Sequence, residues 1–336
     1  MSEKVTVIGA GGWGTATAIM LAKKGFAVKL WARRTELSQQ ISTTRENTDY
    51  LPGVVLPANI EITSDLDKAV AQCSYLVLAT PTKAIRETIT RAAPHISGDT
   101  VVVSLSKGLE RSTLLRCSQV IAEVLGSEDR VAVLSGPNHA EEVARDIPTA
   151  TVAAAYDLGV AEMVQDLFMA PKFRVYTNSD IIGVELAGAL KNIIALGAGI
   201  CDGLGFGDNT KAALMTRGIA EITRLGVAMG ANPLTFAGLA GIGDLIVTCT
   251  SKHSRNWRAG YALGRGETLN QIMERTGMVV EGVYTTEVAA QLAEREEVVM
   301  PITAALKEVL FEGKSPQLAV TELMVRDKTD EAEDLD

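Results

Sequence analysis

Residues 4–16 of the chain read KVTVIGAGGWGTA, and this stretch decides the fold. Its first five residues are rich in β-branched side chains and predict a buried strand, and the small and apolar residues 15–24 predict a helix. Between them, Gly9, Gly11 and Gly14 fill the pattern G-x-G-x-x-G. In that pattern the first glycine permits a tight turn, the second admits a pyrophosphate and the third lets helix and strand pack closely. The flanking strand and helix favour a dinucleotide-binding turn over a purely structural one.

The nucleotide is predicted from the end of the second strand, residues 27–31, which leads to Arg33 and Arg34. An acidic residue about 20 positions beyond the glycine turn would bond the ribose 2′-hydroxyl of NAD, whereas cations there suit the 2′-phosphate of NADP. An arginine fork matches phosphate oxygens. We therefore predict NADP(H) as cofactor with NAD(H) also tolerated, and the alternative is an exposed basic turn.

Strand and helix segments alternate as far as residue 178, which is typical of a doubly wound parallel sheet. Further strands are predicted at 60–63, 75–80, 100–105, 130–134, 149–154 and 173–176, with a helix beginning at Asp65. Beyond residue 178 the pattern is helical, at 181–201, 210–229, 286–295 and 303–312. The predicted fold class is α/β, with an N-terminal Rossmann-type doubly wound domain (1–178), a C-terminal all-α substrate domain (179–326) and a disordered acidic tail (327–336).

Residues 181–201 are almost entirely apolar or glycine and are long enough to cross a membrane. Glu185 and Lys191 lie inside the run, however, and its flanks lack interfacial aromatic residues. We predict a buried helix and no membrane span.

Composition narrows the function. The 336 residues carry a net charge of −9, which argues against a nucleic-acid partner and requires a local cation cluster for any anionic ligand. Four scattered cysteines and three histidines predict neither a disulfide framework nor a metal site. The chain enters its first strand at once, so we expect no signal peptide and a cytoplasmic protein.

Lys191 is the most informative single residue. Small and apolar residues share its helical face, namely Val184, Ala187, Ile194 and Ala195. Burial among them would lower the lysine pKa and make the ammonium a usable proton donor for the reduction of a ketone, with Asn192 orienting the substrate. The alternative is a snorkelling lysine or one paired with Glu185, although six positions place those two on different faces.

Two further groups could hold an anion. Lys107 follows the strand 100–105 at the carboxyl edge of the sheet, where open α/β folds bind ligands. Asp244 and Thr248 would share one face of a helix, and the polar loop 251–256 contains Arg255, which is suited to gripping a phosphate. In each case the alternative is a solvated side chain.

Several stretches together resemble the bacterial-type NAD(P)-dependent glycerol-3-phosphate dehydrogenases. They are residues 7–16, SKGLE at 106–110, SGP at 135–137, ELAGALKN at 185–192, GIGD at 241–244, SRN at 254–256 and VVEG at 279–282. The resemblance implies reversible reduction of dihydroxyacetone phosphate to sn-glycerol 3-phosphate, which supplies glycerophospholipid synthesis.

The resemblance also implies roles for individual residues. Lys191 matches the catalytic lysine. Substrate contacts fall at Lys107, Gly136, Asn138, Asn192, Asp244, Thr248, Ser254, Arg255 and Asn256. Cofactor contacts fall at Gly9, Gly11, Gly12, Trp13, Gly14, Arg33, Arg34, Tyr50, Lys107, Ala140, Arg255, Val279 and Glu281. One departure is Asn138, followed by His139, where the family usually has a small hydroxyl residue and then an aromatic one.

Two alternatives remain at this level. Another β-hydroxyacid-type dehydrogenase, such as a 6-phosphogluconate or 3-hydroxyisobutyrate relative, would share the domain plan and a lysine but not the SRN pattern. A sensor or scaffold that binds NADPH without turnover would leave Lys191 incidental. The expected partners are a small phosphorylated substrate and, by base rate alone, a second copy in a homodimer.

Overall fold

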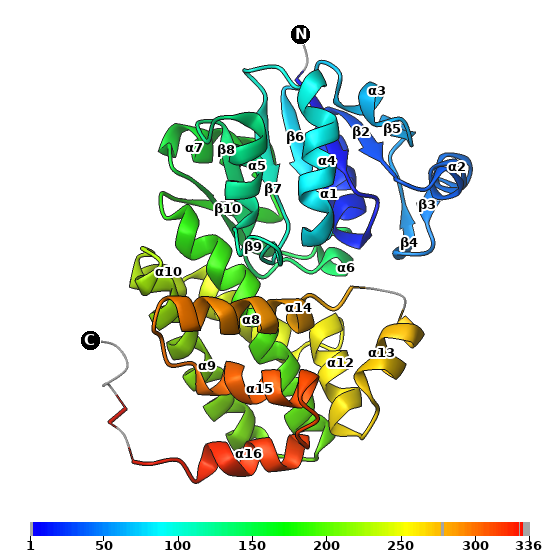
Figure 1. Cartoon of the computed structure of the whole chain (residues 1–336). Helices are drawn as coiled ribbons and strands as arrows, with labels where there is room; N and C mark the ends of the chain where they lie inside the picture. The colour runs from blue at the N-terminus through cyan, green and yellow to red at the C-terminus, as the bar shows by residue number, and fades with distance from the viewer. Residues whose placement is uncertain (1–2, 277–278, 329, 332–336) are drawn as a thin grey trace. The chain divides into compact units, whose positions relative to one another are not determined.

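The computed structural model describes residues 3–276, 279–328 and 330–331. The chain forms two compact units, drawn in Figure 1: unit 1 comprises Met1–Ser106 and Cys117–Ile181, and unit 2 comprises Lys107–Arg116 and Ile182–Asp336. The short stretch Lys107–Arg116 therefore packs with the helices of unit 2, although in the sequence it lies between two segments of unit 1.

Unit 1 is built on an eight-stranded sheet in the order β10-β9-β8-β7-β6-β1-β2-β5. Its strands are β1 (Lys4–Ile8), β2 (Ala27–Trp31), β5 (Ile60–Thr63), β6 (Tyr75–Leu78), β7 (Val101–Ser104), β8 (Val131–Ser135), β9 (Thr149–Ala155) and β10 (Phe173–Asn178). All eight predicted strands are confirmed. The central strands β6, β7 and β8 are buried along their whole length, because helices cover both faces of the sheet.

The predicted doubly wound parallel sheet is confirmed except at one pair, since β8 and β9 run antiparallel. The only helix between them is α6 (Ala140–Val143), a single turn about 6 Å long, whereas β8 spans about 17 Å. The chain therefore returns beside β8 instead of crossing the sheet. All other neighbours in the sheet are parallel, as the fold class requires.

The helices of unit 1 are α1 (Gly12–Lys23), α2 (Thr35–Thr44), α3 (Leu66–Val70), α4 (Ile85–Ala92), α5 (Cys117–Leu125), α6 and α7 (Leu158–Phe168), with 3₁₀ turns at Thr82–Ala84 and Ala93–His95. In Figure 1, α4 and α5 lie side by side over one face of the sheet. Val5, Val7, Val77 and Val103 on the other face share a core cluster with residues of α1 and α7.

A two-stranded hairpin of β3 (Glu46–Asn47) and β4 (Leu51–Val55) follows α2 and was not predicted. β3 has only two residues and β4 reads LPGVV, so neither shows the alternating pattern of a strand.

The regular secondary structure in the described residues of unit 2 is helical, and the non-helical stretch Lys107–Arg116 adds one isolated bridge between Leu109 and Arg116. Its helices are α8 (Ile181–Gly203), α9 (Asp208–Ala228), α10 (Pro233–Phe236), the π-helical segment Leu239–Gly243, α11 (Asp244–Thr250), α12 (Arg255–Gly264), α13 (Leu269–Thr276), α14 (Glu281–Arg295), α15 (Pro301–Phe311) and α16 (Pro316–Met324). The predicted all-α domain is confirmed. The predicted disorder of the tail 327–336 falls largely outside the described residues.

Two stretches of unit 2 are long and apolar enough to cross a membrane by length and composition alone. In Ile181–Gly203, 94% of the most apolar window is buried within the protein, which agrees with the predicted core helix. The other, Pro233–Thr250, is 44% buried and is divided by the π-helical segment.

Candidate active site

The glycine turn between β1 and α1 has the geometry that the motif predicts. Gly9 has φ +111°, and a Cβ there would lie 2.7 Å from the carbonyl oxygen of Ala79. A Cβ on Gly14 would overlap the carbonyl oxygen of Gly9, so helix and strand touch through their backbones. A Cβ on Gly11 would meet nothing within 4 Å. The turn is therefore open at Gly11, where the N–H groups of the first turn of α1 and the positive end of its dipole suit a pyrophosphate.

The β3–β4 hairpin holds this turn in place. Asn47 is fully buried, and its Nδ2 donates to the carbonyl oxygen of Ala10 at 3.0 Å and to Thr15 Oγ1 at 2.8 Å. A Cβ on Gly12 would lie 2.9 Å from the carbonyl oxygen of Tyr50, so the backbone of the hairpin rests on the turn. Sequence reasoning missed Asn47, because nothing in its neighbourhood marks it as a partner of residues more than thirty positions away.

The two arginines after β2 are both exposed. Arg34 pairs with Asp49 of the hairpin loop, with 3.0 Å between guanidinium nitrogen and carboxylate oxygen. Arg33 makes no hydrogen bond or ion pair with any residue that the structure describes. Both guanidinium groups can reach solvent, as a site for a 2′-phosphate requires.

The remaining predicted positions of unit 1 lie near the glycine turn or in the segment that follows β8 in the chain. Trp13 is partly buried, with its ring centroid 6.5 Å from that of Phe173. The Ala140 methyl group would contact a Cβ on Gly12 at 3.6 Å. Gly136 has φ +140°, and Asn138 is buried with its Nδ2 donating to Thr151 Oγ1 at 3.3 Å.

Lys191 lies at the centre of unit 2, on α8, with 6% of its side chain exposed. Its Nζ is 2.6 Å from Asp244 Oδ1 and donates to Thr248 Oγ1 at 2.7 Å. The Thr248 hydroxyl donates in turn to the carbonyl oxygen of Asp244 at 2.6 Å, so its orientation is fixed. An ammonium has three N–H donors, and the third has no partner among the described residues. It is available to a substrate oxygen.

Burial lowers the pKa of Lys191 to about 8, against the opposing influence of the Asp244 carboxylate and with help from the nearby Lys107 cation. Burial alone would raise the pKa of Asp244, but the charges of Lys107 and Lys191 outweigh it and hold that pKa below its ordinary value. The arrangement keeps a carboxylate beside a lysine that can lose its proton near neutral pH.

Lys107 reaches the same carboxylate, with its Nζ 2.8 Å from Asp244 Oδ2. Asp244 is 2% exposed and bridges the two lysines. The stretch that carries Lys107 is tied to α8 by a buried ion pair of Arg116 and Glu185 at 2.6 Å. Glu185 therefore pairs with Arg116 and not with Lys191, which removes the alternative of an intrahelical ion pair.

A chain of three hydrogen bonds links Lys107 to the start of α14. Asn192 Nδ2 donates to the carbonyl oxygen of Lys107 at 3.1 Å, Asn256 Nδ2 donates to Asn192 Oδ1 at 2.8 Å, and the N–H of Gly282 donates to Asn256 Oδ1 at 2.9 Å. Each amide nitrogen retains one N–H without a partner in the described parts of the chain. This chain brings the segment with Val279 and Glu281 next to the two asparagines.

The segment 251–256 was predicted to be a loop, and this is wrong at its end. Ser254 is the N-cap of α12, its hydroxyl accepting from the N–H of Trp257 at 3.1 Å, so Arg255 and Asn256 form the first turn of a helix. Arg255 is exposed there, and the helix N-terminus favours an anion. A Cβ on Gly260 would overlap the backbone of Leu196, so only glycine lets α12 lie this close to α8.

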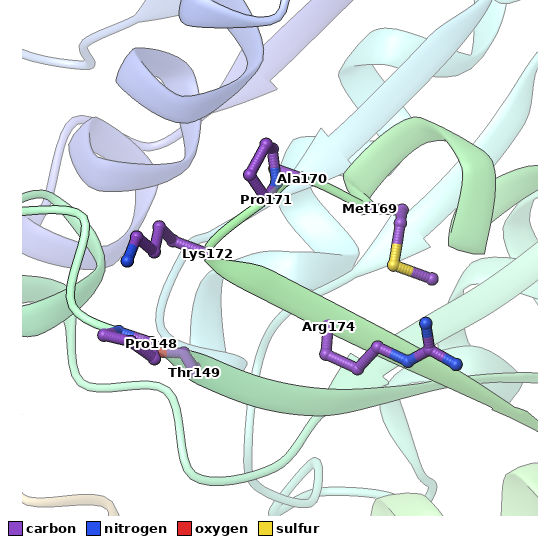
Figure 2. Close-up of a pocket in the computed structure, with 7 residues that line it drawn as sticks. All are labelled: Pro148, Thr149, Met169, Ala170, Pro171, Lys172 and Arg174. Atoms are coloured by element: carbon purple, nitrogen blue, oxygen red, sulfur yellow. The ribbon is translucent and has the colours of Figure 1, made fainter.

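The hollow in Figure 2 belongs to a different part of unit 1. It has a volume of about 630 Å³ and is lined by Pro148, Thr149, Met169, Ala170, Pro171, Lys172 and Arg174. It lies at the β9–β10 edge, whereas the glycine turn follows β1. Figure 2 shows the charged ends of Lys172 and Arg174 pointing in different directions, so the two cations do not converge on one ligand.

Within the described residues, no group of three or more His, Cys, Asp or Glu side chains is arranged to hold a metal ion.

The comparisons with known proteins identify the family of the chain. The chain matches the family models described as NAD-dependent glycerol-3-phosphate dehydrogenase N-terminus, over residues 4–161, and C-terminus, over residues 180–321. It is 58% identical to the NAD(P)+ glycerol-3-phosphate dehydrogenase of Pelotomaculum thermopropionicum, covering 100% of this chain and 97% of that one, and 56% identical to that of Bacillus subtilis, covering 99% and 97%. The crystal structure of glycerol-3-phosphate dehydrogenase from Coxiella burnetii is similar with a TM-score of 0.92 and 38% identity, covering 97% of this chain and 99% of that one. The chain therefore belongs to the NAD-dependent glycerol-3-phosphate dehydrogenase family.

Proposed function

We propose that the chain catalyses the reversible reduction of dihydroxyacetone phosphate to sn-glycerol 3-phosphate with NADPH or NADH, and so supplies glycerophospholipid synthesis. The observation that carries the proposal is Lys191, a buried lysine with a lowered pKa and one N–H left for a ligand. Its relatives from Pelotomaculum thermopropionicum and Bacillus subtilis are named for the same reaction class and for both cofactors.

Unit 1 fits the dinucleotide. Gly11 leaves open space beside the backbone, and Gly9 and Gly14 fix the turn around it. We assign the pyrophosphate to the segment Gly9 to Gly14, including Gly12 and Trp13. Arg33 and Arg34 would hold the 2′-phosphate. Further cofactor contacts are proposed at Tyr50, Lys107, Ala140, Arg255, Val279 and Glu281.

Unit 2 fits the phosphorylated ketone. Bound NAD(P)H supplies a hydride to the carbonyl carbon, which leaves charge on the carbonyl oxygen. Lys191 donates a proton to that oxygen through its third N–H. Asp244 favours the protonated form of Lys191, because its carboxylate attracts the ammonium charge. Thr248 fixes the direction of the ammonium by accepting one of its hydrogen bonds.

The phosphate of the substrate is assigned to the start of α12. Arg255 provides an exposed guanidinium, and the helix N-terminus capped by Ser254 adds a favourable dipole. Asn192 and Asn256 each retain a buried N–H for substrate oxygens. Lys107, Gly136 and Asn138 complete the proposed substrate contacts.

We propose residues 1–178 as the dinucleotide-binding domain and residues 179–326 as the substrate and catalytic domain. A cytoplasmic location and a homodimer are proposed with them, the second on base rate alone.

The experiment is oxidation of NADPH on addition of dihydroxyacetone phosphate, followed by its absorbance, for the wild type and Lys191→Ala. We expect the variant to lose about two to four orders of magnitude of turnover while binding NADPH normally, because general acid catalysis is lost. Glu287→Gln is a control in the same unit, since Glu287 makes an ion pair with the exposed Arg111. Intact NADPH binding by the wild type without oxidation would contradict the proposal.

A further inference from the structure

Asp49 contacts Arg34, the residue proposed to hold the 2′-phosphate that distinguishes NADP(H) from NAD(H). Its carboxylate accepts a hydrogen bond from the guanidinium of Arg34 at 3.0 Å, and half of each side chain is exposed. Arg34 lies three residues beyond the end of β2, the strand end at which a dinucleotide fold recognises the adenosine ribose. At this point an acidic side chain suits a 2′-hydroxyl and a cation suits a 2′-phosphate. The chain presents both, in contact with each other.

The position of Asp49 is fixed by the same hairpin that holds the glycine turn. Asn47, two residues earlier, is anchored on Ala10 and Thr15, and the carbonyl of Tyr50, the next residue, rests against Gly12. Asp49 therefore cannot move away from the glycine turn without loss of these contacts. An exposed ion pair of this kind contributes little to stability, so a ligand can separate it.

We propose that Asp49 determines the balance between the two cofactors: its carboxylate pairs with Arg34 and accepts from the ribose 2′-hydroxyl of NAD(H), and it opposes the 2′-phosphate of NADP(H). With the phosphorylated cofactor, Arg34 turns from Asp49 to the phosphate, and the carboxylate is left beside a second anion. With the unphosphorylated cofactor, Asp49 supplies the acceptor that the strand end itself lacks.

The inference rests on the proposed cofactor site, and its test reads binding instead of turnover. The probes are 2′-phospho-ADP-ribose and ADP-ribose, titrated calorimetrically into wild type and Asp49→Asn. The variant keeps the shape of the side chain and removes its charge. We expect it to bind 2′-phospho-ADP-ribose about threefold to tenfold more tightly and ADP-ribose about threefold more weakly, because one like charge and one charged acceptor are lost.

Glu36→Gln is the matched control. Glu36 lies in the first turn of α2, close enough to influence Arg34 by its charge, and no hydrogen bond joins them. It should change both affinities much less than Asp49→Asn does. In an Arg34→Gln background, Asp49→Asn should keep part of its gain for the phosphorylated probe, because the carboxylate opposes the phosphate even where no ion pair can form.

Three results would overturn the inference: equal changes for the two probes in Asp49→Asn, an equal effect of Glu36→Gln, or complete loss of the gain in the Arg34→Gln background. Thermal unfolding of each variant checks that the fold is retained. Failure of the wild type to bind either probe would refute the cofactor site itself and the inference with it. Normal binding without dehydrogenase activity would refute only the proposed reaction.

Discussion

Replacing Asp244 by Asn should move the pH dependence of the reduction to lower pH. Asp244 is the nearest anion to Lys191, with its Oδ1 2.6 Å from the ammonium nitrogen, and it opposes the lowering of the lysine pKa by burial and by Lys107. Without the carboxylate the two lowering influences are opposed only by the smaller influence of Cys249. An opposite charge at this range shifts a pKa by about 1 to 3 units, so the pKa of Lys191 should fall from about 8 to about 6.

The sign and size of the effect follow from the proton donor. Reduction needs the protonated lysine, so its rate falls as pH rises through the pKa of Lys191. At about pH 7 roughly nine tenths of the lysine is protonated in the wild type and roughly one tenth in the variant, a loss of about tenfold from protonation alone. At about pH 5.5 this loss should nearly vanish.

The assay is kcat for reduction of dihydroxyacetone phosphate at saturating NADPH between about pH 5 and 9. Asp244→Glu restores the charge and should recover much of the wild-type profile, whereas Glu287→Gln removes a carboxylate from the same unit and should leave the profile unchanged. Asp244→Asn with a lower rate but the same midpoint as the wild type would refute the assignment of the proton to Lys191.

Three further predictions concern the surroundings of the site. Asn47→Ala should destabilise the protein by about 1–3 kcal/mol, because two buried acceptors lose their hydrogen-bond donor. The variant should also bind NADPH more weakly. Unchanged affinity in a titration would show that the hairpin does not hold the turn. Glu185→Ala should cost about 3–5 kcal/mol in urea unfolding by removing one partner of its buried ion pair with Arg116, and a loss under about 1 kcal/mol would contradict this. Burial raises the pKa of Glu221 to about 7, against the backbone N–H groups of Ile302 and Thr303, so the folded state binds this proton more tightly than the unfolded chain. Stability should therefore fall by roughly 3 kcal/mol as pH rises from about 4.5 to about 7, and urea unfolding of Glu221→Gln, which cannot titrate, should lack this slope.

Much of unit 1 could be predicted because its signals are local. Strand, glycine turn and helix lie within one short stretch, and β6, β7 and β8 are compact, almost wholly apolar runs. The antiparallel β9 could not be predicted, because strand direction depends on how a connection packs and not on the composition of the strand. The β3–β4 hairpin was missed for a related reason: it is stabilised by contacts with the turn, and its own residues form strands poorly.

The chemistry of the candidate site divides in the same way. The sequence by itself determined the dinucleotide turn, the cations after β2 and a lysine among apolar neighbours, because these depend on residues adjacent in the chain or on one helical face. Only the tertiary structure decided which groups meet that lysine. Asp244 and Lys107 come from segments 53 and 84 positions away from Lys191, and they reach it only when the helices of unit 2 pack. The lysine pKa is set there, because it depends on burial and on charges within a few ångströms, and neither is a property of the local sequence.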